Sequence, residues 1–193
     1  MAVNHDTEIL AVLLGIGLAA SAGFRVFVPL FAASVAGHYG LLSLSGSWQW
    51  LGSPLAMLVL GAAVLVESAS YLIPYVDHAL DVLAVPLSGV AGTLLVMSQT
   101  AGLDPALSWG LALIAGGGTA MALSGATAGG RLVSTASSGG LANPVYAAGE
   151  TGTAIGLSLL ALFMPVLAVL LGAALLLALV LWWRRKKTTS RVR

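Results

Sequence analysis

Long apolar runs dominate the chain and are separated by short polar segments. The longer runs approach or exceed the roughly 20 residues that an α-helix needs to cross ~30 Å of hydrocarbon. We expect six membrane-spanning helices over about residues 8–36, 54–73, 76–98, 106–134, 144–163 and 166–183. The first and fourth exceed the length of one span, so each is expected to be tilted or interrupted, the first near Gly23. The pattern predicts an all-α integral membrane protein.

Composition favours the same class of protein. Of the 193 residues, 59% are hydrophobic and 8% are charged, whereas soluble domains carry roughly 25% charged residues. The mean hydropathy is +1.00. A soluble fold of this size would have to cover most of its surface with polar groups. The chain has no cysteine, which excludes disulfide frameworks, thiolate metal sites and cysteine nucleophiles.

The basic residues predict the orientation of the chain. Six of the eight lie beyond residue 183, namely Arg184, Arg185, Lys186, Lys187, Arg191 and Arg193. The positive-inside rule places this tail, residues 184–193, on the cytoplasmic side of the inner membrane. Segments 37–53 and 101–107 contain no Lys or Arg, so they suit the opposite side. Six spans would then place the N-terminus on the cytoplasmic side as well.

Three segments recur in the same order in the two halves of the chain. The pairs are Ala20–Val26 with Ala126–Leu132, Leu51–Pro54 with Leu141–Pro144, and Pro74 with Pro165. One insertion of 16 residues in the first half, inside the loop at about 37–53, accounts for the change in spacing between the pairs. We therefore expect one three-helix repeat at 1–104 and another at 105–183. An odd number of spans per repeat makes the two repeats inverted in the membrane.

Ionisable residues inside predicted spans are costly in hydrocarbon and therefore mark candidate functional positions. At a rise of ~1.5 Å per residue, five of them fall in the cytoplasmic half of the bundle. These are Glu67, Asp77, Asp81, Arg131 and Glu150. A second arginine element, Gly23 with Arg25, is expected near the opposite face, where Arg25 either snorkels to the interface or binds an anion.

Two interpretations of the cluster stay open. In the first, it is the path of a small transporter or channel, with Glu150 or Glu67 loading and releasing an inorganic cation or a proton. In the second, the charges only hold helices together in a non-transporting scaffold or partner-binding protein. The spacing of Asp77, His78 and Asp81 is more typical of a polar helix start than of a metal site. We therefore expect no metal and no other cofactor.

Other function classes lack support in the sequence. The motifs GxxxxGK[ST], HExxH and GxSxG do not occur, and the three histidines fall at predicted helix ends or loops. We therefore expect no enzyme activity. Binding of anionic lipid headgroups accounts for the short basic tail without nucleic acid. The expected partners are the lipid bilayer, a small ion or proton and, as a homo-oligomer, further copies of the chain.

The chain resembles a bacterial membrane family, domain of unknown function 4126, over nearly its whole length. The resemblance rests on Gly23–Pro29, Glu67, Ile73–Asp77 with Asp81, Ala91–Thr93, and Gly140–Pro144 with Glu150. It adds Asn143, inside the last of these segments, to the candidate positions. The family has Asn after Asp77 where this chain has His78, which argues against His78 as an essential ligand. The resemblance implies no activity, so it bears on architecture and positions alone.

Overall fold

The computed structural model describes residues 5–44, 46–70, 74–139 and 141–189, with side chains described except at 5, 74–80 and 182–189. In these ranges the chain is helical and contains no β-strand. The elements are α1 (His5–Ala22), α2 (Phe27–His38), a 3-10 helix η1 (Gly46–Gly52), α3 (Pro54–Ser70), α4 (Pro74–Gln99), α5 (Pro105–Leu111), a π-helix η2 (Ala112–Gly117), α6 (Gly118–Ser138), α7 (Asn143–Phe163) and α8 (Pro165–Thr189).

Local sequence sets most helix ends. Prolines occupy the first position of four helices, at Pro54, Pro74, Pro105 and Pro165. A proline is suited to this position because its φ is already helical and its missing N–H has no partner there in any case. The Asp104 side chain caps α5 by accepting a hydrogen bond from the Ala106 N–H at 2.9 Å. Helix α6 ends at Ser138 and is followed by Gly139, whose φ of +62° is the left-handed conformation that glycine readily adopts.

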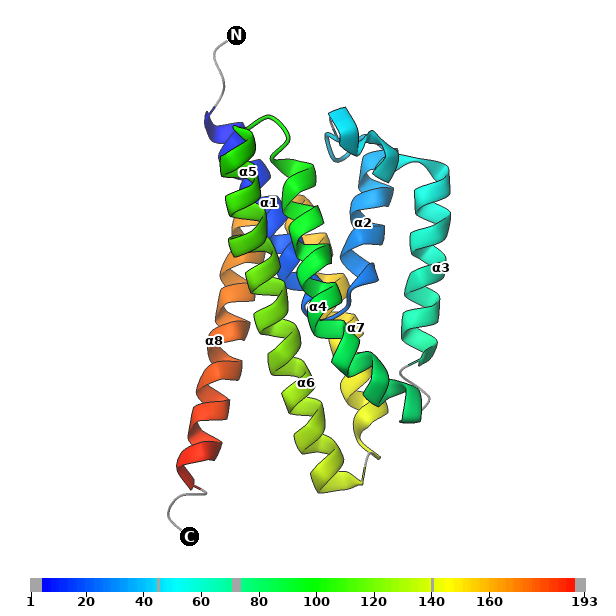
Figure 1. Cartoon of the computed structure of the whole chain (residues 1–193), viewed down its shortest axis with the longest axis vertical. Coiled ribbons are helices and arrows are strands. Elements are labelled where there is room, and N and C mark those ends of the chain that lie inside the picture. Colours follow the sequence, from blue (N-terminus) through cyan, green and yellow to red (C-terminus); the bar gives the residue numbers. More distant parts are fainter. Residues whose placement is uncertain (1–4, 45, 71–73, 140, 190–193) are drawn as a thin grey trace.

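The first predicted span forms a hairpin of two helices. Helix α1 ends at Ala22, the chain turns over residues 23–26, and α2 runs back toward the end of the bundle where α1 began (Figure 1). The tip of the hairpin is enclosed by protein, since Arg25 is 2% exposed and Val26 is 7% exposed. The expected interruption near Gly23 is confirmed, but a single span over 8–36 is wrong. A non-helical segment is tolerated at this depth because protein surrounds it.

The remaining helices cross the bundle in alternation. Helix α3 runs downward in Figure 1, α4 upward, the continuous segment α5–η2–α6 downward, α7 upward and α8 downward. Within the described residues, three helices are long and apolar enough to cross a membrane. They are Asp81–Gln99, Pro105–Ser138 and Asn143–Phe163, and η1 with α3 would make a fourth as one bent span. The structure therefore supports three or four membrane spans, and the prediction of six stays a prediction.

Corresponding helices of the two halves run in opposite directions, but the halves differ in their first element. Helices α3 and α7, which begin at the repeated segments ending in Pro54 and Pro144, run in opposite directions, as do α4 and α8 (Figure 1). The segment around Arg25 is the tip of a hairpin, whereas the matching segment around Arg131 lies inside the uninterrupted helix α6. The inverted repeat therefore stays a prediction.

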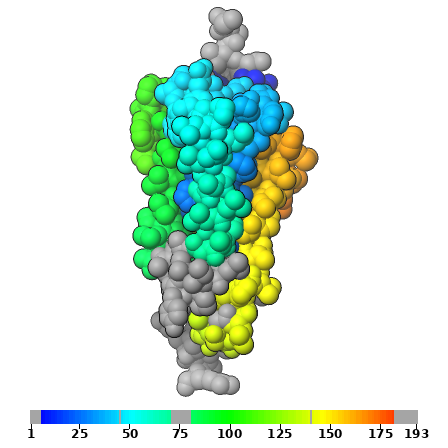
Figure 2. Space-filling view, turned by 90° about the vertical axis from the view of Figure 1, so that its right-hand side faces the viewer, coloured from blue at the N-terminus to red at the C-terminus, as the bar shows by residue number. Residues whose placement is uncertain are grey.

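Small residues allow α1 to run through the middle of the bundle. Helix α1 packs against α4, α7 and α8. A Cβ on Gly17 would lie 3.0 Å from the Cβ atoms of both Ala161 and Ala168. Because lipid provides no hydrophobic drive between helices, such close packing supplies much of their attraction. Helix α3, by contrast, lies at the outside, between α4 on one side and α7 on the other (Figure 2).

The start of the first helix and the end of the last helix lie on opposite sides of the bundle. Helix α1 begins at the top of Figure 1 and α8 ends at the bottom. The expectation that both termini lie on the cytoplasmic side stays a prediction. The hairpin of α1 and α2 returns to the side of the bundle where it began.

The hairpin makes a prediction about topology. In a cysteine-free chain, Asp6→Cys and Ser43→Cys should react with a membrane-impermeant maleimide from the same side of intact cells, and Ser137→Cys from the opposite side. The reason is that both ends of the hairpin lie at one end of the bundle and the α6–α7 connection at the other. Labelling of positions 6 and 43 from opposite sides would instead mean that α1 and α2 together cross the membrane.

Candidate functional site

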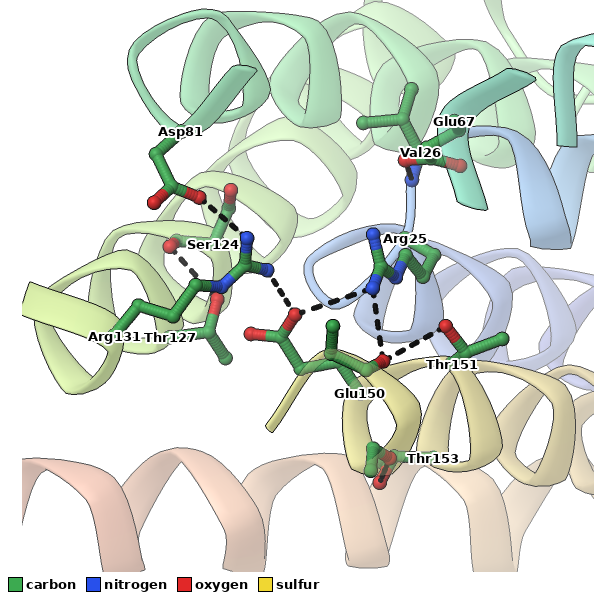
Figure 3. Close-up of polar contacts among 12 residues, drawn as sticks. Arg25, Val26, Glu67, Asp81, Ser124, Thr127, Arg131, Glu150, Thr151 and Thr153 are labelled. Carbon is green, nitrogen blue, oxygen red and sulfur yellow. Dashed lines mark hydrogen bonds and ion pairs between the residues drawn. The ribbon is translucent and has the colours of Figure 1, made fainter. Parts of the chain in front are cut away.

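A buried arginine on α6 joins two other helices. Nη1 of Arg131 lies 2.8 Å from Oδ1 of Asp81 on α4, and its Nη2 donates to Oε2 of Glu150 on α7 (Figure 3). Arg131 is 3% exposed and Glu150 is 4% exposed. One guanidinium group therefore binds two carboxylates in a region with little access to water. Charge-assisted hydrogen bonds of this kind are among the strongest in proteins.

Arg25 reaches the same carboxylate from the tip of the hairpin. Its Nη2 donates to the carbonyl oxygen of Ala147 at 2.9 Å and lies 3.8 Å from Oε2 of Glu150. Glu150 is thus shared by two arginines (Figure 3). The expectation that Arg25 stands apart, near the opposite face, is wrong. The hairpin turns back inside the bundle, so residue 25 lies at the depth of the other charges.

Glu67 lies on the other side of the hairpin tip. Its Oε1 accepts a hydrogen bond from the Val26 N–H at 2.9 Å, and its Oε2 accepts one from the Phe27 N–H at 3.2 Å. These N–H groups belong to the first turn of α2, where backbone donors lack partners within the helix and the helix dipole favours a negative charge. Glu67 therefore caps α2 and ties the outer helix α3 to the hairpin.

The cluster has more acidic than basic groups. Among the described side chains we define the charge cluster as Arg25, Glu67, Asp81, Arg131 and Glu150, which comprises two guanidinium groups and three carboxyl groups. With all five ionised, the cluster carries one excess negative charge. An excess charge away from water is costly, and a proton or a monovalent cation would remove it. The side chain of Asp77, also expected here, lies outside the described residues, as does that of His78.

Asn143 belongs to a neighbouring contact. Its Nδ2 donates to Oγ1 of Thr135 at 3.0 Å, which ties the start of α7 to the last turns of α6. The second arginine element is also placed: Gly23 begins the hairpin turn, and a Cβ there would overlap the Cβ of Leu123 and lie 2.9 Å from the Ala120 carbonyl oxygen. Gly23 therefore lets the tip approach α6 closely enough for Arg25 to reach the charge cluster.

A pocket of about 490 Å³ opens beside Glu150. Its walls come from α6, α7, α8 and the hairpin tip, and include Phe24, Thr127, Ser134, Tyr146, Glu150, Thr153, Leu175 and Leu179. The other carboxylate oxygen of Glu150, Oε1, is buried and has no hydrogen-bond partner among the described residues. The carboxylate thus has one oxygen engaged by arginines and one that is not.

Tyr146 was missed by sequence reasoning. It lies one helical turn before Glu150 and therefore on the same face of α7. Its hydroxyl group packs against Gly130, where an added Cβ would overlap it. The spacing of Tyr146 and Glu150 was a usable signal, but the contact with Gly130 depends on how α6 and α7 pack. Among the described residues, no group of three or more His, Cys, Asp or Glu side chains could hold a metal ion.

Residues 12–186 match the family described as Domain of unknown function (DUF4126). The chain belongs to this family. The match extends from α1 into α8 and includes every residue of the charge cluster. No curated protein and no solved structure matches the chain. The resemblance seen in the sequence is therefore confirmed, and the function of this DUF4126 protein has to be argued from its site.

Close packing at the hairpin tip makes a prediction about stability. In this DUF4126 protein, Gly23→Ala should lower the apparent melting temperature in detergent, with a loss of about 1–3 kcal/mol from overpacking against Leu123 and the α6 backbone. Gly125→Ala on α6 is the matched control, because a Cβ there would meet no other atom within 4 Å. Equal melting temperatures for the two variants would contradict the packing of the hairpin tip.

The shared ion pair should appear in a double-mutant cycle. Arg131→Gln and Glu150→Gln should each cost about 3–5 kcal/mol of unfolding free energy, because each leaves the other partner buried without its counter-charge. The double variant should cost less than the sum of the singles by about 1–3 kcal/mol. Reversible unfolding in mixed micelles would measure this. Additive losses would mean that the two side chains do not pair.

Proposed function

We propose that this protein is a small transporter or channel of the inner membrane, in which a proton or a monovalent cation loads at Glu150. The observation that carries the proposal is a buried charge cluster with one carboxyl group in excess at the tip of a re-entrant hairpin. An excess charge inside a membrane bundle is costly and so marks a candidate functional site. A charge network that only holds helices together would cost less free energy if its positive and negative charges were equal in number.

The broken first helix supports a pathway. Membrane proteins tolerate irregular backbone at this depth where it is buried in protein or lines a cavity. In many transporters, interrupted helices of this kind form the substrate site near the middle of the membrane. Here the interruption brings Arg25 to within 3.8 Å of Glu150. The hairpin therefore places irregular backbone beside the group that is proposed to load the substrate.

Loading of Glu150 leaves both arginines with partners. A proton or cation on Glu150 would cancel the negative charge that attracts Arg25 and Arg131. Arg131 would keep its ion pair with Asp81 at 2.8 Å, and Arg25 would keep its hydrogen bond to the Ala147 carbonyl at 2.9 Å. Each arginine therefore keeps one of its contacts when Glu150 is loaded.

The proposed path lies between the two halves of the chain. Both ion pairs that cross the cluster, Arg25 with Glu150 and Asp81 with Arg131, join residues 1–104 to residues 105–183. The opposite directions of α3 and α7, and of α4 and α8, favour an inverted repeat with six membrane elements (Figure 1). Relative movement of inverted halves about a shared site is a common mechanism of transport.

A specific observation also favours the scaffold interpretation. Each arginine of the charge cluster contacts a carboxylate on another helix, so the contacts can hold the bundle together without moving an ion. A scaffold requires that the cluster stay closed at every pH and salt concentration. Transport requires that Glu150 exchange partners. Flux measurements separate the two functions.

The test is flux into liposomes that contain the purified protein. Wild type should dissipate an imposed gradient of H⁺ or Na⁺, and Glu150→Gln and Glu67→Gln should lower the rate by about tenfold or more. Asp104→Asn is the matched control: it makes the same carboxylate-to-amide change at the cap of α5, where Asn also caps. A wild-type protein that moves no ion, or variants as fast as the control, would favour the scaffold instead.

A further inference from the structure

The pocket beside Glu150 is larger and more apolar than an inorganic ion requires. Its volume of about 490 Å³ lies within the roughly 300–1,000 Å³ typical of small-molecule sites. A water molecule occupies only about 30 Å³ of liquid volume. Apolar side chains form part of the wall, with Phe24 from the hairpin tip and Leu175 and Leu179 from α8. A bare ion would leave most of this space unfilled.

The charge in the pocket has a definite sign. Glu150 is the one charged residue among the described side chains that line it, and neither arginine of the charge cluster does so. The arginines engage Oε2 of Glu150, whereas Oε1 has no hydrogen-bond partner among the described residues and Glu150 is 4% exposed. Figure 3 draws this second oxygen on the side of Thr127, which lines the same pocket. The pocket therefore favours a positively charged ligand.

Hydroxyl groups and aromatic rings complete the site. Thr127, Ser134 and Thr153 line the same pocket as Glu150 and carry hydroxyl groups. Phe24 and Tyr146 add ring faces, which attract cations through their quadrupoles. Val145, also part of the lining, is 77% exposed, so the pocket opens at the surface of the bundle. A ligand can thus enter from outside the helices.

We infer that the pocket between α6, α7 and α8 binds an organic cation, an amine or quaternary ammonium with an apolar body, whose charged nitrogen lies on the side of the pocket formed by Glu150. The hydrocarbon part packs on Phe24, Leu175 and Leu179. This inference rests on the proposed function and names its substrate class. The cation supplies the one positive charge that the charge cluster lacks, and its apolar body fills the volume that a bare ion would leave.

The test is binding of a defined probe to the full chain in detergent. Benzyltrimethylammonium combines a quaternary nitrogen with one aromatic ring, and neopentylbenzene is its uncharged carbon analogue. Equilibrium dialysis should show saturable binding of the cation and no saturable binding of the analogue. Equal binding of both would overturn the inference and assign the pocket to apolar molecules such as a lipid chain. No saturable binding of the cation would also overturn it.

Two variants test the site in different ways. Glu150→Gln removes the charge, and Leu175→Trp fills the pocket while leaving the charge cluster intact. Each should weaken binding by about tenfold or more, whereas Leu177→Trp, on the 62% exposed side of the same helix, should stay within about twofold of wild type. If Glu150→Gln does not fold, Leu175→Trp still tests whether the cation binds in this pocket. Unchanged binding in Leu175→Trp would overturn the inference.

Flux and binding separate the two proposals. If wild type conducts protons in liposomes but does not bind benzyltrimethylammonium, the substrate class is wrong and the pathway stands. If wild type binds the cation with the expected variant pattern but moves neither protons nor the cation, the pocket is a binding site and the transport proposal fails. The two experiments use the same purified chain, so a folding defect would appear in both.

Discussion

The fold depends on the sharing of the Glu150 carboxylate between Arg25 and Arg131. An arginine surrounded by protein inside a membrane needs a counter-charge, since the loss of hydration is otherwise not offset. Glu150 supplies it to two arginines from two elements, and Asp81 supplies it to Arg131 from a third. The hairpin tip, α4, α6 and α7 are therefore fixed relative to one another by a few charged groups at one depth.

Packing and charge require the same position of the hairpin. Gly23 allows the tip to approach α6, Gly17 allows α1 to pass between α7 and α8, and Glu67 satisfies the first N–H groups of α2. A hairpin that ended one turn earlier or later would separate Arg25 from Glu150 and leave the α2 donors without an acceptor. This agreement of steric and electrostatic demands explains how a non-helical segment can persist inside a membrane bundle.

Part of the site could be predicted from the sequence, because an ionisable residue within an apolar run is a local property of the chain. Glu67, Asp81, Arg131 and Glu150 were found as ionisable residues within apolar runs, and their depth followed from the rise of a helix. Arg25 was misplaced, because run length cannot show whether a chain crosses the membrane or turns back inside it. The contact of Tyr146 with Gly130 and the pocket beside Glu150 were missed for a related reason: both depend on how α6, α7 and α8 pack together.

The sequence by itself determined that this is a helical membrane protein of the DUF4126 family, where most helices begin, and which side chains had to be buried at a cost. Apolar run lengths, prolines and isolated charges determine these features, and each acts over one helix. Only the tertiary structure decided that the first predicted helix is a hairpin of two helices and that two arginines share one carboxylate. Both features depend on contacts between Arg25 and residues more than 100 positions away, which no local pattern encodes.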